Sequence, residues 1–184
     1  LNGIFGFLFE SDPFKDMISD FIDSLVGEEQ PEEPAPEEPE IATFKLMSFN
    51  MRVQPGKASD KRTEYDTVKD RAPLILQHIA DADPDIICVQ EWTYSHLQYV
   101  APELEDDYNI EIFHRDALGL ESAAILFKKD RFELVSTEKF WLSETPNEMS
   151  IGWDASYHRI YSAVILRDKL SGKTFRAGTT HLDL

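Results

Sequence analysis

The sequence predicts a layered α/β sandwich whose sheets mix parallel and antiparallel strands. From residue 43 onward, strand-like and helix-like segments are mixed along the chain, and the strands outnumber the helices. Some strands alternate apolar and polar residues, whereas others are short, fully apolar runs. This mixture is typical of sheets packed in layers with helices, and it argues against a purely doubly wound parallel fold.

The negative charge is concentrated at the amino terminus. The chain has a net charge of -17, and residues 1–40 carry twelve acidic residues against one basic residue. The remainder carries 23 acidic and 17 basic residues and is only mildly acidic. This balance argues against tight, sequence-independent binding to duplex DNA, which depends on many Lys and Arg contacts with phosphate. It does not exclude a small phosphorylated substrate.

Residues 1–27 are predicted to form an amphipathic helical appendage. Pro13 suits the first turn of a helix, and Gly27 suits its end. The apolar residues at helical spacing are Phe14, Ile18, Phe21 and Leu25. The acidic polar face argues against attachment to anionic lipid, so we expect this helix to pack on the body or on a partner. No apolar stretch approaches the length of a transmembrane span.

Residues 28–42 are predicted to form an extended, solvated linker. They contain the run EEQPEEPAPEEPE, in which proline fixes the backbone and the acidic side chains repel one another. Residues 43–184 then form the predicted globular domain.

The first three elements of this domain are predicted to be strand, helix and strand. Residues 43–50, TFKLMSFN, alternate in polarity and predict a strand that ends near Asn50. Residues 67–82 predict an amphipathic helix. Its apolar stripe consists of Val68, Ala72, Ile75 and Ile79. Residues 83–91, DPDIICVQE, predict a short buried strand that ends at Glu91.

The rest of the domain is predicted to be rich in strands. A second helix is expected from Tyr94 to Leu104. Strands are then expected at residues 109–115, 122–128, 132–142 and 160–168. The turn KLSGK joins the last of these to a strand at residues 174–182, and its Ser-Gly pair indicates a hairpin.

Cys88 is the only cysteine, so an intramolecular disulfide is excluded. It lies in the apolar run DIICVQ, with no basic residue nearby in the sequence. We therefore expect a small buried side chain and not a reactive thiol.

Polar residues follow three of the predicted strands. Asn50 follows LMSF, Glu91 follows IICVQ, and His181 and Asp183 follow FRAGTT. The carboxyl ends of strands are where α/β folds tend to assemble binding sites. Each residue also has a structural explanation: Asn50 as a turn residue, Glu91 as a helix-start carboxylate and His181 as a buried imidazole.

Six short motifs occur in an order that resembles the endonuclease/exonuclease/phosphatase family, which includes DNase I-like and exonuclease III-like enzymes. They are LMSFNMR, RAPLILQHIADADPDIICVQE, ESAAILFKKDRFELV, FWLSETP, GWDASYHRIYSAVILRD and TTHLD. The similarity covers residues 43–184. It implies a DNase I-like sandwich and a metal-dependent phosphohydrolase, with Mg²⁺ as the expected ion and Mn²⁺ as the alternative.

The resemblance also implies roles for individual residues. Glu91 matches the glutamate that binds the divalent ion, and Asn50 matches the asparagine at the metal and phosphate site. His181 matches the catalytic histidine, and Glu121 matches the acidic residue that orients it. Arg159 matches a basic residue near the substrate phosphate. Asp183 belongs to the same motif as His181 and is also expected at the substrate phosphate.

These roles agree with the chemistry of phosphate ester hydrolysis. Water attack on phosphorus requires neutralisation of the oxygens, and a hard ion held by one or two carboxylates and by waters suits Mg²⁺. An imidazole can transfer a proton near neutral pH, and a carboxylate partner fixes its tautomer. Arg159 could bind phosphate as a two-pronged donor, although a purely structural place beside a strand is an equal alternative.

The sequence also departs from the family pattern. The family continues to a GDFN-like motif and an SDH-like motif, and neither occurs here. His158 stands where relatives often carry Pro before the arginine. The sequence therefore predicts a domain truncated at its carboxyl end. Because the missing half is expected to supply the second sheet, we expect these 184 residues alone to be marginally stable, aggregation-prone or dependent on a partner, and inactive as a hydrolase.

Several alternatives remain open at this point. The phosphorylated substrate is expected to be nucleic acid, a phospholipid head group or a sugar phosphate, and the acidic body slightly disfavours duplex nucleic acid. A non-catalytic binding module, or a degenerate remnant on the same scaffold, is the alternative to an enzyme. The apolar start and acidic tether are compatible with a secreted or surface-tethered bacterial protein and equally with a cytoplasmic one.

Overall fold

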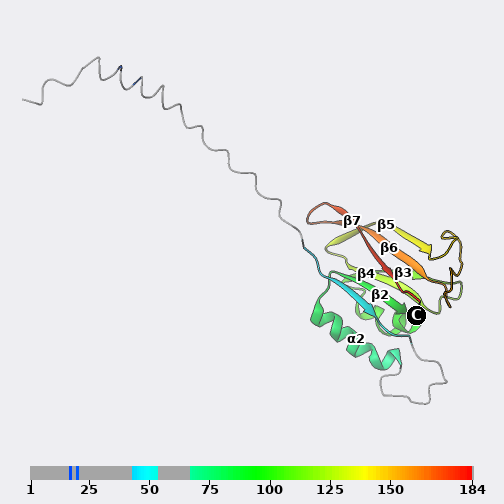
Figure 1. Ribbon diagram of the computed structural model, residues 1–184. Helices are drawn as coiled ribbons and strands as arrows, with labels where there is room; N and C mark the ends of the chain where they lie inside the picture. The colour runs from blue at the N-terminus through cyan, green and yellow to red at the C-terminus, as the bar shows by residue number, and fades with distance from the viewer. Residues whose placement is uncertain (1–16, 18–19, 21–42, 54–66, 184) are drawn as a thin grey trace, which may run out of the picture. The chain divides into compact units, whose positions relative to one another are not determined.

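The computed structural model describes residues 43–53 and 67–183, together with Met17 and Asp20 (Figure 1). The chain divides into two units, Leu1–Ile41 and Ala42–Leu184. In the first unit, Met17 and Asp20 are helical and exposed. The rest of the helix predicted within residues 1–27, and the whole linker predicted at residues 28–42, lie outside the described residues. The division into appendage, linker and domain therefore stays a prediction.

The first sheet of the second unit has four strands in the order β1-β2-β4-β3. Their bounds are β1 Leu46–Asn50, β2 Ile86–Trp92, β3 Tyr108–His114 and β4 Ser122–Lys128. β1 and β2 are parallel, whereas β4 is antiparallel to both β2 and β3. The carboxyl ends of β1 and β2 therefore lie beside the start of β4, and this arrangement positions the site described below.

Helix α2, Val68–Ala82, connects β1 to β2 and packs on one face of this sheet (Figure 1). The side chain of Thr67 caps its start by accepting a hydrogen bond from the amide of Asp70. The buried residues of α2 are the four of the predicted stripe: Val68, Ala72, Ile75 and Ile79. They pack against apolar side chains of β2 and β4, including Ile87, Val89 and Leu126. The prediction for this helix is confirmed.

The second predicted helix is shorter than expected. Helix α3 covers Tyr94–Tyr99, and a separate 3-10 turn, η1, covers Ala101–Glu103. Pro102 lies inside that turn and has no amide hydrogen to continue an α-helical ladder. The expectation of one helix from Tyr94 to Leu104 was wrong for this reason.

Three antiparallel strands form a second sheet in the order β5-β6-β7. Their bounds are β5 Phe132–Trp141, β6 Ile160–Asp168 and β7 Thr174–Thr180. Gly172, at a φ of 68°, provides the left-handed residue of the turn between β6 and β7. The predicted hairpin at residues 169–173 is confirmed.

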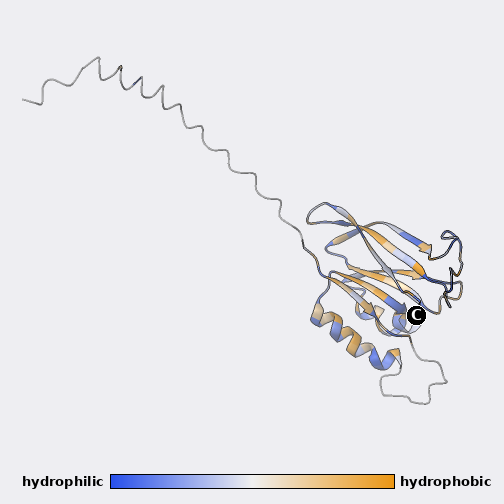
Figure 2. Ribbon diagram, in the orientation of Figure 1, coloured by the Kyte–Doolittle hydropathy of each residue, from blue (hydrophilic) through white to orange (hydrophobic). Residues whose placement is uncertain are grey.

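The two sheets pack face to face, and their inner faces form an apolar core. The first sheet contributes Ile86, Cys88, Ile125 and Phe127, and the second contributes Val164, Leu166 and Ala177. Figure 2 shows hydrophobic residues concentrated along these strands. The expectation that the missing half supplies the second sheet was therefore wrong, because β5, β6 and β7 already build one. The predicted layered α/β sandwich with mixed sheets is confirmed.

Cys88 lies within this core and is 3% exposed. Burial raises the pKa of its thiol to about 11, so the thiol stays protonated at neutral pH. This agrees with the prediction of a small buried side chain. Within the part of the chain that the structure describes, no helix is long and apolar enough to cross a membrane.

Candidate active site

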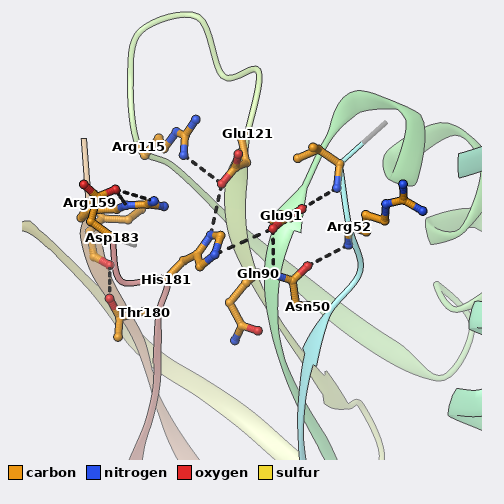
Figure 3. Close-up of polar contacts among 12 residues, drawn as sticks. Asn50, Arg52, Gln90, Glu91, Arg115, Glu121, Arg159, Thr180, His181 and Asp183 are labelled. Atoms are coloured by element: carbon orange, nitrogen blue, oxygen red, sulfur yellow. Dashed lines mark hydrogen bonds and ion pairs between the residues drawn. The ribbon is translucent and has the colours of Figure 1, made fainter. Parts of the chain in front are cut away.

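Four of the residues singled out in the sequence lie together at one end of the sandwich. Asn50 ends β1, Glu91 lies near the end of β2, Glu121 precedes β4, and His181 follows β7 (Figure 3). Three of these elements belong to the first sheet and one to the second. The site therefore depends on the packing of the two sheets.

Glu91 occupies an irregularity in its strand. The pairing between β2 and β4 shifts register between Val89 and Trp92, and Glu91 has a φ of 63°. A glutamate in the left-handed region is strained, and such bulges often redirect a side chain next to an active site. Ile87 and Val89 face α2, so regular alternation would also direct Glu91 toward the helix. The bulge turns it toward the end of β1.

The carboxylate of Glu91 is held by two hydrogen bonds from the β1 end. Asn50 Nδ2 donates to Oε1 at 2.8 Å, and the amide of Val53 donates to Oε2 at 2.6 Å. Partial burial alone would raise the pKa of Glu91. The two hydrogen bonds, with the nearby His181 and Arg115, outweigh burial and lower this pKa below its ordinary value. Glu91 is therefore an anion at neutral pH.

The segment after β1 fixes the side chain of Asn50. Its Oδ1 accepts a hydrogen bond from the amide of Arg52 at 2.9 Å, so its amide nitrogen is directed at Glu91. Arg52 has a φ of 60°, and its carbonyl accepts a hydrogen bond from the Arg71 guanidinium of α2. Helix α2 thus supports the tight turn that presents Asn50.

His181 lies between two carboxylates. Its Nδ1 is 3.3 Å from Oε1 of Glu121, and its Nε2 is 3.8 Å from Oε1 of Glu91. The side chain of His181 is 34% exposed, so it remains accessible to solvent. A histidine held by a carboxylate at one nitrogen can exchange a proton at the other, which is the arrangement required for acid–base chemistry.

Arg159 and Asp183 form a partly buried ion pair at the second sheet. Arg159 Nη2 and Nε donate to Oδ1 of Asp183 at 2.7 and 3.1 Å. Oδ2 of Asp183 accepts a hydrogen bond from the amide of Ser156. Asp183 thus ties the loop before β6 to the residues that follow β7, and it holds the guanidinium of Arg159.

Three neighbouring residues were not identified from the sequence. Arg115 follows β3 and donates from Nη1 to Oε1 of Glu121 at 2.9 Å. Tyr157 lies beneath the guanidinium groups of Arg115 and Arg159, whose carbons are 5.2 and 5.6 Å from its ring centroid. Gln90 donates to the hydroxyl of Thr179 at 2.9 Å and so links β2 to β7. Gln90 and Tyr157 lie within two of the six motifs but carry no acidic, basic or imidazole group, and Arg115 lies outside the motifs, so no sequence signal identified them.

The site contains a small pocket of about 20 Å³ that is lined by residues from both sheets. Its charged, imidazole and amide lining side chains are Gln90, Arg115, Glu121, His158, Arg159 and His181. The pocket therefore combines two guanidinium groups with the His181 and Glu121 pair. Among residues 43–53 and 67–183, no cluster of three or more His, Cys, Asp or Glu side chains is placed to share one ion.

Comparisons with known proteins agree with this fold. No protein-family profile matches the sequence. A solved endonuclease/exonuclease/phosphatase family protein from Bacteroides thetaiotaomicron is 32% identical, with a TM-score of 0.68, over 76% of this chain and 50% of that protein. A mannosyl-6-phosphatase from the same species is 32% identical, with a TM-score of 0.65, over 77% of this chain and 52% of that protein.

The chain belongs to the endonuclease/exonuclease/phosphatase family. Nocturnin from Xenopus laevis is 29% identical over 117 residues, which cover 55% of this chain and 30% of Nocturnin. The chain spans about half the length of the solved relatives and less of this curated one.

As a member of the endonuclease/exonuclease/phosphatase family, the chain has the scaffold of a phosphohydrolase. Its site contains an anionic carboxylate at Glu91, a histidine paired with Glu121, and the guanidinium groups of Arg115 and Arg159. These groups can respectively bind a cation, transfer a proton and bind a phosphate oxygen.

Proposed function

We propose that this chain carries the site of a Mg²⁺-dependent phosphate ester hydrolase. The observation that carries the proposal is the position of Glu91. Its anionic carboxylate is held by Asn50 and Val53 and lies 3.8 Å from the imidazole of His181. A cation at Glu91 and a proton donor or acceptor at His181 would then face the same phosphate.

The donor set around Glu91 fits Mg²⁺ or, as the alternative, Mn²⁺. Mg²⁺ retains several waters and is often held by only one or two carboxylates together with substrate phosphate, so a cluster of three acidic groups is not required. Glu91 would supply the carboxylate. Asn50 Nδ2 donates to that carboxylate and cannot bind a cation, so Asn50 would supply Oδ1 as a second oxygen ligand in exchange for its hydrogen bond from the amide of Arg52. When bound, the ion would neutralise charge on the phosphate oxygens.

The residues of the chain itself would handle the proton and the phosphate. Glu121 orients His181 through Nδ1, which leaves Nε2 to exchange a proton with water or with the leaving oxygen. Arg159, held by Asp183, would bind a non-bridging oxygen of the phosphate. In this proposal Asp183 acts on the phosphate through Arg159.

Nucleic acid, phospholipid head groups and sugar phosphates all present the required phosphate. The similarity to a mannosyl-6-phosphatase supports a sugar phosphate, and the net negative charge of the chain disfavours duplex nucleic acid.

Isothermal titration calorimetry with Mg²⁺ tests the metal site without requiring turnover. We expect saturable binding by the unaltered chain and none by Glu91→Gln. Glu133→Gln is the matched control, because Glu133 pairs with Arg167 on the outer part of the second sheet. Equal Mg²⁺ binding by the unaltered chain and Glu91→Gln would contradict the proposed site.

The proposal includes the expectation that these 184 residues alone do not turn over substrate. The site supplies one metal-binding carboxylate and one acid–base pair, whereas the family motif expected to position the attacking water is absent from the sequence. We expect background rates on phosphate ester substrates. Mg²⁺-dependent turnover that is lost in Glu91→Gln would overturn this expectation while supporting the hydrolase site.

A non-catalytic binding module is the second candidate function. It is favoured by the guanidinium groups of Arg115 and Arg159, which line the pocket and need no metal ion to bind a phosphate oxygen. A chain that binds phosphate esters equally well with and without Mg²⁺ would favour this alternative.

A further inference from the structure

We infer that Gln90 is a positioning residue of the proposed site. Its side-chain amide, bonded to Thr179, sets where His181 of the second sheet lies relative to the carboxylates of the first sheet. This inference rests on the proposed function, in which His181 acts together with Glu91 and Glu121.

Gln90 ends a row of apolar side chains on β2. Ile86 and Cys88 face the second sheet within the core, and Gln90 is the next residue on that face. On β7, Ala177 faces the first sheet, and Thr179 is the next residue on its face. Each row therefore ends on a polar side chain. These two side chains meet, because Gln90 Nε2 donates to Oγ1 of Thr179 at 2.9 Å.

The hydrogen bond between Gln90 and Thr179 does more than hold the sheets together. Thr179 is 5% exposed, and removing its hydroxyl from water is costly unless the hydroxyl is hydrogen-bonded. Apolar contacts between the sheets are non-directional, whereas a hydrogen bond fixes both a distance and an angle. The pair therefore contributes chiefly to the alignment of β7 on β2.

The same amide also contacts the strand that carries Asn50. Gln90 Nε2 donates to Oγ of Ser48 on β1 at 3.3 Å. Ser48 lies two residues before Asn50 in the sequence, and Thr179 lies two residues before His181. The side chain of Gln90 leaves β2 toward the strand that carries His181 (Figure 3). One amide thus connects three strands of both sheets just before each strand presents its site residue.

The site tolerates little movement between the sheets. Nδ1 of His181 is 3.3 Å from Glu121, and its Nε2 is 3.8 Å from Glu91. β7 ends at Thr180, so His181 lies beyond the strand pairing with β6. An increase of about 1 Å would break the hydrogen bond at Nδ1, and a misplacement of this size can lower a reaction rate about 100-fold.

The tautomer of His181 reports whether Glu121 still holds Nδ1. A carboxylate acceptor keeps the proton on that nitrogen, and long-range proton–nitrogen NMR spectroscopy of the metal-free chain at about pH 8.5, where an ordinary histidine is neutral, distinguishes the two tautomers. We expect the Nδ1–H form in the unaltered chain. We expect a mixture of both forms in Thr179→Val, which keeps the shape of the side chain and removes the hydroxyl.

Three further variants separate positioning from a general loss of stability. Thr179→Ser keeps the hydroxyl and should retain the Nδ1–H form. Ser171→Ala removes a hydrogen bond to the buried carboxylate of Asp168, beyond the opposite end of β7. It should lower the melting temperature by a few degrees and leave the tautomer unchanged. Gln90→Met removes the donor in place of the acceptor, so it should give the mixture and decides the question if Thr179→Val does not fold.

The outcomes distinguish this inference from the proposed function. Thr179→Val should bind Mg²⁺ like the unaltered chain in titration calorimetry, because Glu91 is held within the first sheet. If Glu91→Gln also binds Mg²⁺ like the unaltered chain, the proposed function fails, and the tautomers still decide whether Gln90 positions His181. The inference is overturned by an Nδ1–H form that persists in both Thr179→Val and Gln90→Met, or by a mixture in the unaltered chain.

Discussion

The pKa of His96 shows how strongly burial can change the protonation of a single side chain. It is fully buried, its ring stacks on Trp92 at 5.5 Å, and its Nδ1 accepts a hydrogen bond from the amide of Thr93. Burial lowers the pKa of His96 from 6.5 to about 4, although the backbone of Met51 and, to a smaller extent, the neighbouring Glu91 oppose part of this shift. His96 is therefore neutral in the folded protein at pH values where an exposed histidine is charged.

This shift predicts a loss of stability in weak acid. Between about pH 6.5 and pH 4, the unfolded chain binds a proton at His96 and the folded chain does not, so falling pH favours unfolding. We expect the free energy of unfolding to fall by about 2 kcal/mol between pH 7 and pH 5, as measured by urea denaturation.

A substitution at His96 isolates this contribution. His96→Gln removes the titrating group and should flatten the dependence of the free energy of unfolding on pH between pH 7 and pH 5. His78→Gln, at an exposed site on α2, should keep it. The lowered pKa values of Glu91 and Asp168 act at lower pH, because their ordinary values are 4.5 and 3.8. An unchanged slope in His96→Gln would refute the assignment.

At the scale of elements, the turn before β6 stores backbone strain. The amide of Ala155 donates to the carbonyl of Gly152 at 3.1 Å, and Trp153 within the turn has a φ of 49°. A Cβ at Gly152 would lie 2.2 Å from the carbonyl oxygen of Leu142, so this glycine allows the turn to pack closely on the end of β5. Trp153 is 72% exposed and gains little from burial.

Trp153→Asn should relieve this strain. Asparagine tolerates the left-handed region, so we expect a stabilisation on the order of 1 kcal/mol and a melting temperature about 3 °C higher by circular dichroism. Trp153→Phe keeps the unfavourable φ and should melt like the unaltered chain. No increase in the asparagine variant would show that the turn is not strained.

At the scale of the whole molecule, each of the two sheets has an edge strand beside the site. Among the described residues, β1 pairs only with β2, and β7 pairs only with β6. Leu46 on β1 is 56% exposed, and Leu74 on the neighbouring helix is 54% exposed. Open edges with apolar side chains favour association between chains.

We therefore expect the isolated chain to self-associate, and to do so more strongly as salt screens its net charge of -17. Sedimentation velocity at low and high salt measures this, and Leu46→Lys should reduce the associated fraction. A monomer that melts cooperatively at every salt concentration would contradict the expectation.

Much of the fold could be predicted from the sequence because local periodicity encodes secondary structure. The stripe of α2 and the strands around β1, β2 and β4 were predicted at nearly their observed bounds. The helix after β2 was predicted too long, since Pro102 ends the regular hydrogen bonding early. The strands of the second sheet were predicted individually, but their assembly into a sheet was not. Their packing on β2 and β4 joins residues far apart in the sequence, so no local pattern indicates it.

The sequence by itself determined the order of the elements and which polar residues come at strand ends, because both depend on neighbours along the chain. Only the tertiary structure decided that the bulge in β2 turns Glu91 toward Asn50, and that Arg115 and Arg159 meet at Tyr157. These contacts join residues far apart in the sequence. They form only when strand pairing and sheet packing have fixed the distances, and no local pattern specifies them.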